Sequence, residues 1–148
     1  TPCRTDLDAL LDSLVCDYVD AGQPIRLTGR VGRPLMTRPH TLRRIIVNLT
    51  DNALKFGGDT EIMLDAAMPD HVKIIVRDRG PGIPEHELKA VLQPYYRVES
   101  SRNRESGGTG LGLAIAQQLT IALGGTLLLS NREGGGLDAI LSLPVSAD

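Results

Sequence analysis

The stretch from residue 41 to residue 56, TLRRIIVNLTDNALKF, constrains the fold more than any other part of the chain. Its apolar residues recur at the three-and-four spacing of an amphipathic helix, and at roughly 100° per residue they fall within an arc of about 100°. A stripe of this width can be buried against a sheet. Its members are Leu42, Ile45, Ile46, Leu49, Ala53 and Phe56.

A second, polar stripe borders the first on the same helix. Asn48, Asn52 and Lys55 stand at i, i+4 and i+7, within an arc of about 60°. Asparagine suits a helix interior poorly, because its side chain competes for backbone hydrogen bonds. A solvated surface is the plain alternative. Two asparagines one turn apart beside the core nevertheless indicate a site, since carboxamide oxygens complete a Mg²⁺ shell and a lysine holds phosphate.

The composition suits a single domain with an aliphatic core: 148 residues, 41% hydrophobic and only 3% aromatic. A formal net charge of −2 provides no basic field, so nucleic acid is not an expected partner. Cys3 and Cys16 are too few for a metal site or a disulfide framework, and are expected to be small buried or half-buried thiols in a reducing compartment.

The chain shows no apolar run of the roughly 18 residues that a membrane span needs, and no signal peptide. It begins with Thr1-Pro2 rather than with Met, so we expect it to be an excised part of a larger protein. The lack of a membrane span in this chain then says nothing about membrane segments elsewhere in that protein.

Local patterns place the other elements around the central helix, which should be entered through Thr37 or Thr41 as cap and ended by Gly57-Gly58 in a left-handed helical stop. Apolar periodicity and turn residues predict a hairpin-rich, mixed, mostly antiparallel sheet with helices on one face, an α+β fold. Further helices are expected at 6–18, 84–92 and 110–123, strands at 25–28, 61–67, 71–78, 126–131 and 137–143, and a polar lid at 93–109.

A glycine-bearing segment, Asp78-Arg79-Gly80-Pro81-Gly82, follows one strand directly. Period-two counting puts Asp78 on the buried face of that strand, where a carboxylate needs a partner. The exocyclic amino group of adenine would provide one, and the glycines let the backbone approach a flat ligand. An ordinary strand-to-helix turn is the alternative. A dinucleotide fingerprint is excluded, because the third glycine it requires is replaced by Glu85.

A second glycine segment, GGTGLG at residues 107–112, opens a predicted helix. Helix starts offer unpaired N–H groups and a positive dipole end, and glycines allow phosphate to approach them. It is not a Walker loop, since no Gly-Lys-Ser/Thr is present. Taken alone, the segment could be a flexible hinge.

In this order, the three segments resemble the N-box and the two glycine boxes of the catalytic, ATP-binding domain of bacterial sensor histidine kinases. This domain has the Bergerat fold, shared with gyrase-type and MutL-type ATPases. The resemblance runs from Leu35 to Pro144, and before Leu35 only the general pattern is similar. It implies a two-layer α/β sandwich whose mixed, mostly antiparallel sheet is covered on one face by about three helices.

The resemblance also implies a role for each matching position. Asn52 would ligate Mg²⁺ with Asn48 in support, Lys55 would contact the phosphates, Phe56 would lie against the adenine, and Asp78 would read its amino group. Gly80 and Gly82 would shape the adenine pocket, and Gly108, Gly110, Leu111 and Gly112 would form the turn that wraps the triphosphate. The other nucleotide-binding positions would be Ile83, Tyr96 and Thr109.

Within the lid, Tyr95-Tyr96-Arg97 stands where the family often has Phe-x-Arg, so Arg97 would contact the γ-phosphate or the partner domain. The tyrosine at 95 departs from that pattern and leaves the anchoring of the lid open.

Position 48 bears on the reaction. Hydrolases of this fold carry a glutamate there as general base, which an asparagine cannot replace, whereas a kinase acting on histidine needs positioning and charge neutralisation. We therefore expect Asn48, Lys55 and Arg97 to support phosphotransfer from Mg-ATP to a histidine. An anti-sigma-factor-like Ser/Thr kinase and a non-catalytic nucleotide-binding module remain alternatives.

The histidine acceptor is expected on a dimerisation domain absent from this chain, because His40, His71 and His86 lie in no phosphoacceptor motif. A response regulator would be an indirect partner and the isolated domain a monomer. The resemblance further implies a cytoplasmic domain of an inner-membrane-anchored kinase.

Overall fold

The computed structural model describes residues 2–92 and 112–145, and the lid expected at 93–109 lies outside them. Among the helices it describes, none is long and apolar enough to cross a membrane. The elements in chain order are β1 (Cys3–Thr5), α1 (Leu7–Asp20), β2 (Ile25–Thr28), β3 (Leu35–Thr37), α2 (Pro39–Gly57), β4 (Thr60–Asp65), β5 (His71–Asp78), the 3₁₀ turns η1 (Glu85–Glu87) and η2 (Ala90–Leu92), α4 (Gly112–Ala122), β6 (Thr126–Asn131) and β7 (Leu137–Pro144).

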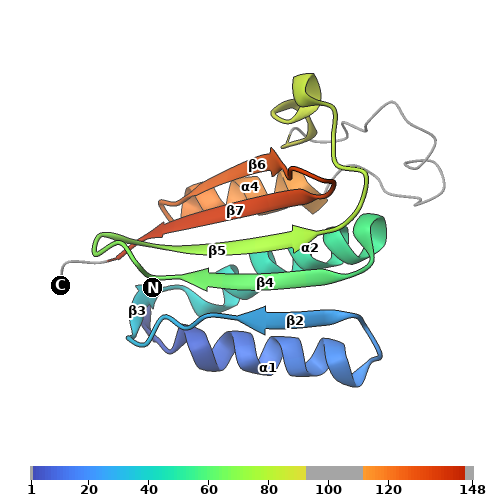
Figure 1. Ribbon diagram of the computed structural model, residues 1–148. Helices are drawn as coiled ribbons and strands as arrows, with labels where there is room; N and C mark the ends of the chain where they lie inside the picture. Colours follow the sequence, from blue (N-terminus) through green and yellow to red (C-terminus); the bar gives the residue numbers. More distant parts are fainter. Residues whose placement is uncertain (1, 93–111, 146–148) are drawn as a thin grey trace.

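Five strands form one mixed sheet in the order β2-β4-β5-β7-β6 (Figure 1). Only β2 and β4 are parallel, and the chain between them includes α2. The pairs β4–β5, β5–β7 and β7–β6 are antiparallel. The mixed, mostly antiparallel sheet predicted from the hairpins is therefore confirmed.

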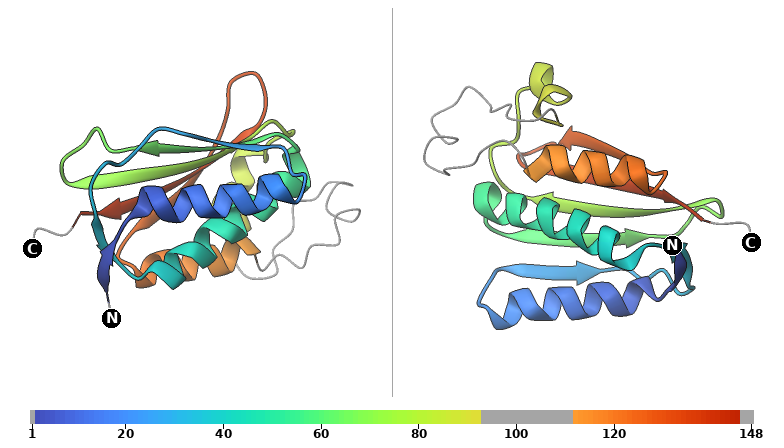
Figure 2. Two further views of the ribbon diagram at one scale, coloured as in Figure 1. Left: turned by 90° about the horizontal axis from the view of Figure 1, so that it is seen from below. Right: turned by 180° about the vertical axis from the view of Figure 1, so that it is seen from behind.

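Helices α1, α2 and α4 cover one face of this sheet, which makes a two-layer sandwich (Figure 2). Burial alternates along β5, where every second residue from Val72 to Asp78 points into the helical layer. The core is aliphatic, as the composition predicts, and each fully buried Leu or Ile contributes about 1.5–3 kcal/mol. Its largest fully buried side chains include Leu7, Leu11, Leu42, Ile45, Ile46, Leu49, Ile62, Ile74 and Leu141. The prediction that Cys3 and Cys16 are buried or half-buried was wrong: both are exposed, and Cys16 lies outside the buried stripe of α1.

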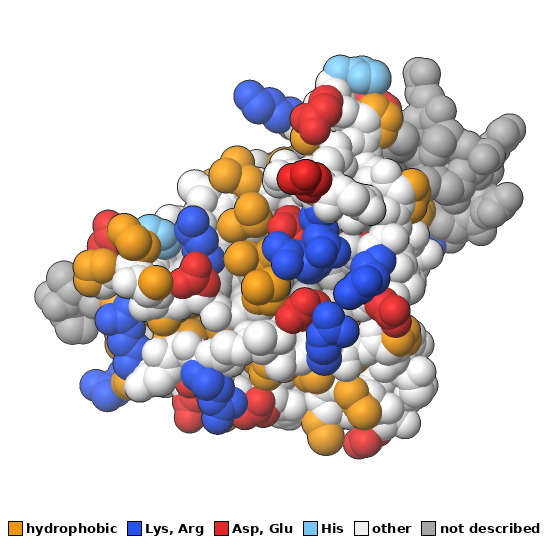
Figure 3. Space-filling model, in the orientation of Figure 1, with side chains coloured by type: hydrophobic (Ala, Val, Ile, Leu, Met, Phe, Trp, Pro, Cys, Tyr) orange, Lys and Arg blue, Asp and Glu red, His pale blue; other side chains and the backbone are white. Residues whose placement is uncertain are grey.

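The opposite face of the sheet carries interleaved basic, acidic and apolar side chains (Figure 3). Arg77 of β5 and Asp138 of β7 stand opposite each other in the ladder. The guanidinium Nε and Nη2 donate to the two carboxylate oxygens at 2.8 and 2.9 Å. This face therefore stabilises strand pairing through charge, while the other face stabilises the fold through apolar burial.

Helix α2 begins earlier than the sequence predicts, at Pro39, and its N-cap residue is Arg38, whose side chain makes no cap hydrogen bond. The prediction of Thr37 or Thr41 as cap was wrong. Proline at the first helical position has a preset φ and lacks an N–H that would be unsatisfied there, so the helix starts without a capping side chain. At the other end, Gly58 has φ 70° but ψ −104°, which is not the left-handed helical stop that was expected.

Two further differences concern short elements. The helix predicted at 84–92 is a pair of 3₁₀ turns, with the N–H groups of Glu87 and Leu88 bonded to the carbonyls of Pro84 and Glu85. So short a segment closes too few α-helical bonds to offset its nucleation. An additional antiparallel pair, β1 with β3, joins residues 3–5 to residues 35–37, and β1 was not predicted.

Candidate functional site

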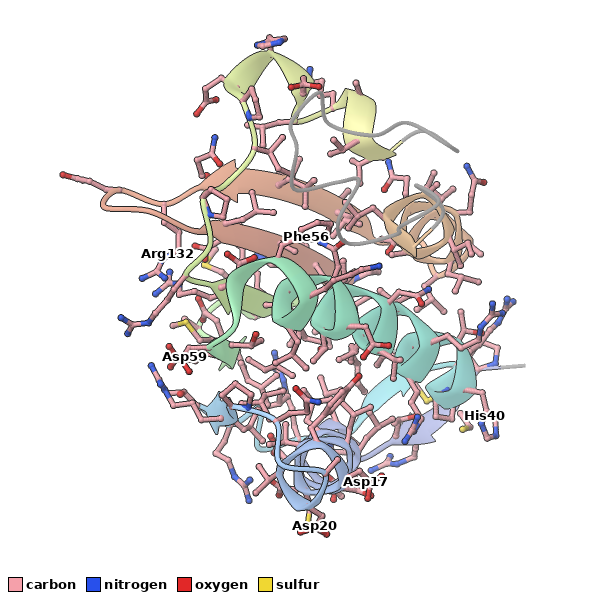
Figure 4. All side chains as sticks on the ribbon, turned by 90° about the vertical axis from the view of Figure 1, so that its right-hand side faces the viewer. Asp17, Asp20, His40, Phe56, Asp59 and Arg132 are labelled. Carbon is pink, nitrogen blue, oxygen red and sulfur yellow. The ribbon has the colours of Figure 1, made fainter. Side chains whose placement is uncertain are left out.

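The buried side of α2 matches the predicted apolar stripe except at its end. Leu42, Ile45, Ile46, Leu49 and Ala53 are buried together with Thr50, whereas Phe56 is only half-buried. Phe56 therefore lies at the margin of the core, at the C-terminal end of the helix (Figure 4). Its prediction as a core residue was wrong, because the buried stripe of α2 ends at Ala53 and Phe56 stands next to the end of the helix at Gly57.

The polar stripe of α2 lies between its buried and exposed sides. Asn48 and Asn52 are half-buried and Lys55 is exposed, as the helical geometry predicts. Two carboxamides and an ammonium group are thus presented along the C-terminal half of the helix, which ends at Gly57. Half-buried and exposed side chains of this kind can reach a ligand bound beside the helix.

Asp78, the last residue of β5, is 4% exposed. Its Oδ1 accepts hydrogen bonds from the backbone N–H groups of Gly80 at 2.9 Å and Leu137 at 3.1 Å. The sequence predicts that this buried carboxylate needs a hydrogen-bond partner, and two backbone N–H groups are among its partners. They also fix the plane in which the carboxylate is presented.

Two glycines bring α2 and the segment after β5 into contact. A Cβ on Gly57 would lie 2.5 Å from Cβ of Asp78, and a Cβ on Gly80 would lie 2.7 Å from the carbonyl oxygen of Phe56. Any larger residue would separate the two elements. The structure therefore brings together Phe56, Asp78 and Gly80, and it places the polar stripe of α2 on the helix that ends there.

The β6–β7 hairpin supports this segment from the other side, which sequence reasoning missed. Arg132 donates from Nη1 to the carbonyl oxygen of Asp78 at 3.0 Å. Ile83, which is 5% exposed, exchanges two hydrogen bonds with the side chain of Asn131. No local pattern identifies these partners, because 54 and 48 residues separate them from their contacts.

Helix α4 lies beside α2 in the helical layer (Figure 2). Its first described residue is the exposed Gly112, and the start predicted at residue 110 lies outside the described residues. Its N-terminal N–H groups and dipole favour an anion there. The other predicted residues of the lid and phosphate turn, Tyr96, Arg97, Gly108, Thr109, Gly110 and Leu111, lie outside the described residues.

The donor set bears on which metal this site could hold. Within residues 2–92 and 112–145, no group of three or more His, Cys, Asp or Glu residues is arranged to bind a metal ion. The carboxamides of Asn48 and Asn52 could supply a hard cation with at most part of its oxygen shell. Such a donor set fits Mg²⁺ that arrives with phosphate and water ligands, and does not fit a resident structural metal.

Sequence comparison identifies related proteins. The profile of the family described as "Histidine kinase-, DNA gyrase B-, and HSP90-like ATPase" matches residues 37–147. Sensor histidine kinase GtrS of Pseudomonas aeruginosa is 39% identical over 139 residues, which are 94% of this chain and 28% of GtrS. Sensor histidine kinase WalK of Bacillus subtilis is 36% identical over 107 residues, 70% of this chain and 18% of WalK. The chain thus spans less than a third of these relatives.

Solved structures agree on the fold. The mycobacterial sensor histidine kinase MprB superposes with a TM-score of 0.80 at 25% identity, covering 98% of each chain. The catalytic domain of histidine kinase ThkA has a TM-score of 0.82 at 22% identity, again covering 98% of each. Full-length ShkA in complex with AMPPNP has a TM-score of 0.82 at 22% identity, covering 99% of this chain and 32% of ShkA. Likeness at such identity establishes the two-layer fold.

Proposed function

Because the chain belongs to the family of histidine kinase-, DNA gyrase B- and HSP90-like ATPases, we propose that it binds Mg-ATP and phosphorylates a histidine. The γ-phosphate passes to the imidazole of a separate dimerisation domain, within two-component signalling. The relatives GtrS and WalK are sensor histidine kinases by name. In the reaction the bond from the γ-phosphorus to the β–γ bridging oxygen breaks, a bond to an imidazole nitrogen forms, ADP leaves, and the imidazole loses its proton.

One observation carries the proposal: a buried, oriented carboxylate lies against the end of the helix that bears the two asparagines. Asp78 is held by two backbone N–H groups, and Gly57 and Gly80 leave no space for a Cβ between it and α2. In the proposed complex, Asp78 accepts the amino hydrogen of adenine and Phe56 lies against the ring. Gly80, Gly82 and Ile83 shape the purine side of the site.

The phosphates are proposed to lie along α2 towards the start of α4. Lys55 neutralises phosphate charge, while Asn52, with Asn48 in support, completes the shell of Mg²⁺. When bound with the nucleotide, Mg²⁺ supplies neutralisation of the charge on the phosphate oxygens. Gly112 opens α4, whose N–H groups face an anion favourably. The proposed contacts from Tyr96, Arg97, Gly108, Thr109, Gly110 and Leu111 belong to the segment outside the described residues.

Transfer is proposed in preference to hydrolysis because of Asn48. A carboxamide does not accept a proton at neutral pH, so this position cannot activate water as a glutamate would. Positioning and charge neutralisation, which the other groups provide, suffice for an imidazole that is itself the nucleophile. We therefore expect slow ATP turnover by the domain when no acceptor is present.

The acceptor histidine is proposed to lie outside this chain. His40 is exposed at the start of α2, His86 is exposed in a 3₁₀ turn, and His71 is paired with Asp70 at 2.8 Å. The chain as a whole is proposed to be one catalytic domain, 1–148, with a lid at 93–109. Its parent would be a membrane-anchored sensor kinase that carries this domain in the cytoplasm. A response regulator would receive the phosphoryl group in a later step. The isolated domain would be monomeric.

The test mixes this chain with the dimerisation and histidine-bearing fragment of its parent, and supplies ATP labelled on the γ-phosphate. Label should appear on the added fragment, and the bond should be labile to acid and stable to alkali, as a phosphoramidate is. Label stable to acid would indicate a Ser/Thr kinase. Nucleotide binding without transfer would indicate a regulatory module, and label on this chain would contradict the assignment of the acceptor.

A further inference from the structure

Asn131, at the end of β6, makes hydrogen bonds with both groups of its carboxamide to the segment after β5, which pairs with none of the described strands. Its Oδ1 accepts from the N–H of Ile83 at 2.9 Å, and its Nδ2 donates to the carbonyl oxygen of the same residue at 2.6 Å. Nδ2 also lies 3.3 Å from Oε1 of Glu85. A flipped amide would oppose donor to donor, so both bonds require one orientation. The side chain thus replaces a strand edge for the segment that follows β5.

The second glycine of Asp-x-Gly-x-Gly provides the space for this contact. A Cβ on Gly82 would lie 2.5 Å from Oδ1 of Asn131, and Gly82 has φ 77°. Both the steric space and the backbone conformation therefore require glycine. Gly80 admits α2 on one side of the segment, and Gly82 admits Asn131 on the other.

The residues that follow Asn131 contact the carboxylate and the main-chain carbonyl of Asp78. Leu137 donates its N–H to Oδ1 of Asp78 at 3.1 Å, and Arg132 donates to the carbonyl oxygen of that residue at 3.0 Å. A Cβ on Gly136 would lie 2.2 Å from the same carbonyl oxygen. The hairpin therefore contacts the segment from Asp78 to Ile83 at both ends.

We propose that Asn131 is a positioning residue for purine recognition. By holding Ile83 it sets the path of the segment between Asp78 and Ile83, and so the distance between the carboxylate and the wall of the purine site. This inference rests on the proposed function, since it concerns the adenine end of the same site. Asn131 touches no reacting atom, so its effect should fall on nucleotide affinity and leave the transfer step unchanged.

The test replaces the carboxamide and measures transfer from ATP to the histidine-bearing fragment of the parent. Asn131→Ala leaves both polar groups of Ile83 without this partner, so KM for ATP should rise about tenfold or more while kcat at saturating ATP stays within about twofold. Asn131→Ser keeps one hydroxyl and should give a smaller rise. Ser130→Ala is the matched control: it removes an exposed hydroxyl that donates to the backbone carbonyl oxygen of Asn131 at 3.4 Å, and it leaves the carboxamide in place. This variant should leave KM unchanged.

Adenosine, used as a competitor, separates the base from the phosphates. Asn131→Ala should weaken adenosine by the same factor as ATP, whereas Lys55→Ala should weaken ATP and leave adenosine unchanged. A fall in kcat with KM constant, or a loss of ATP affinity with adenosine unaffected, would overturn the inference. If Asn131→Ala does not fold, Asn131→Ser decides between the same outcomes. Failure of the wild-type chain to bind ATP would instead refute the proposed function.

Discussion

Replacing Asp78 with Asn tests the recognition of adenine most specifically, because it changes one oxygen to an NH₂ group and keeps the shape of the side chain. Oδ1 remains with the N–H groups of Gly80 and Leu137, since an NH₂ group there would oppose two donors. The NH₂ group therefore replaces Oδ2 and meets the amino group of adenine, donor against donor. The variant should fold and lose base recognition.

The magnitude follows from the burial of the site. Asp78 is 4% exposed, so water cannot replace the lost acceptor. A buried donor left without its partner costs about 1–3 kcal/mol. At about 1.4 kcal/mol per factor of ten, the Kd for ATP should rise about 5- to 150-fold.

The assay is isothermal titration of ATP into the wild-type chain and the variant, with and without Mg²⁺. Asp65→Asn is the matched control, because Asp65 is an exposed carboxylate far from the site. In the ladder Asp78 stands opposite Thr60, the first residue of β4, whereas Asp65 is the last residue of that strand. It should bind as the wild type does. If folded Asp78→Asn bound ATP within about twofold of the wild type, the carboxylate would not be the base-reading group and the reasoning would be refuted.

Three further predictions follow from particular contacts. Gly80→Ala places a Cβ 2.7 Å from the carbonyl oxygen of Phe56, so a thermal melt should show a lower Tm and titration should show weak ATP binding; an unchanged Tm would contradict the close approach. Tyr18→Phe removes the bond of 2.7 Å from the Tyr18 hydroxyl to Oδ1 of Asp51, and urea unfolding should show a loss of about 0.5–1.5 kcal/mol with ATP affinity unchanged. The pKa of Glu61 is lowered, chiefly by the hydrogen bond from the Thr28 hydroxyl and further by Arg26 and Arg77. The charged form of Glu61 therefore stabilises the fold at any pH above the ordinary carboxyl pKa. This stabilisation disappears as the pH falls through the lowered value. Glu61→Gln should flatten the acid limb of Tm against pH, and an identical limb would exclude Glu61 as a contributor.

Periodicity predicted the elements whose reason for forming is local. The apolar stripe from Leu42 to Ala53 and the alternation that buries Asp78 at the end of β5 both appear in the structure on their predicted faces. The hairpins predicted a mixed sheet but not the order of its strands. That order depends on the pairing of β2 with β4, which are separated in sequence by β3 and the whole of α2. The start of α2 at Pro39 was missed since a proline at the first helical position removes the need for a capping side chain.

The candidate site was predictable only as far as its residues are near one another in sequence. Asn48, Asn52 and Lys55 share one helix, and Asp78, Gly80 and Gly82 share one turn, so spacing alone groups each set. Asn131 and Arg132 act on that turn from a different hairpin. An asparagine at a strand end carries no local signal of such a role. The steric need for Gly57 beside Asp78 likewise depends on a contact between two elements.

The most direct test of the account is a two-dimensional amide NMR spectrum of the labelled chain, recorded as Mg-ATP is added. The account predicts that the largest shifts fall on the amides of Gly80, Gly82 and Ile83, on the C-terminal half of α2 and on the start of α4 at Gly112. Shifts confined to the outer face of the sheet around Arg77 and Asp138, or no shifts at saturating nucleotide, would contradict it.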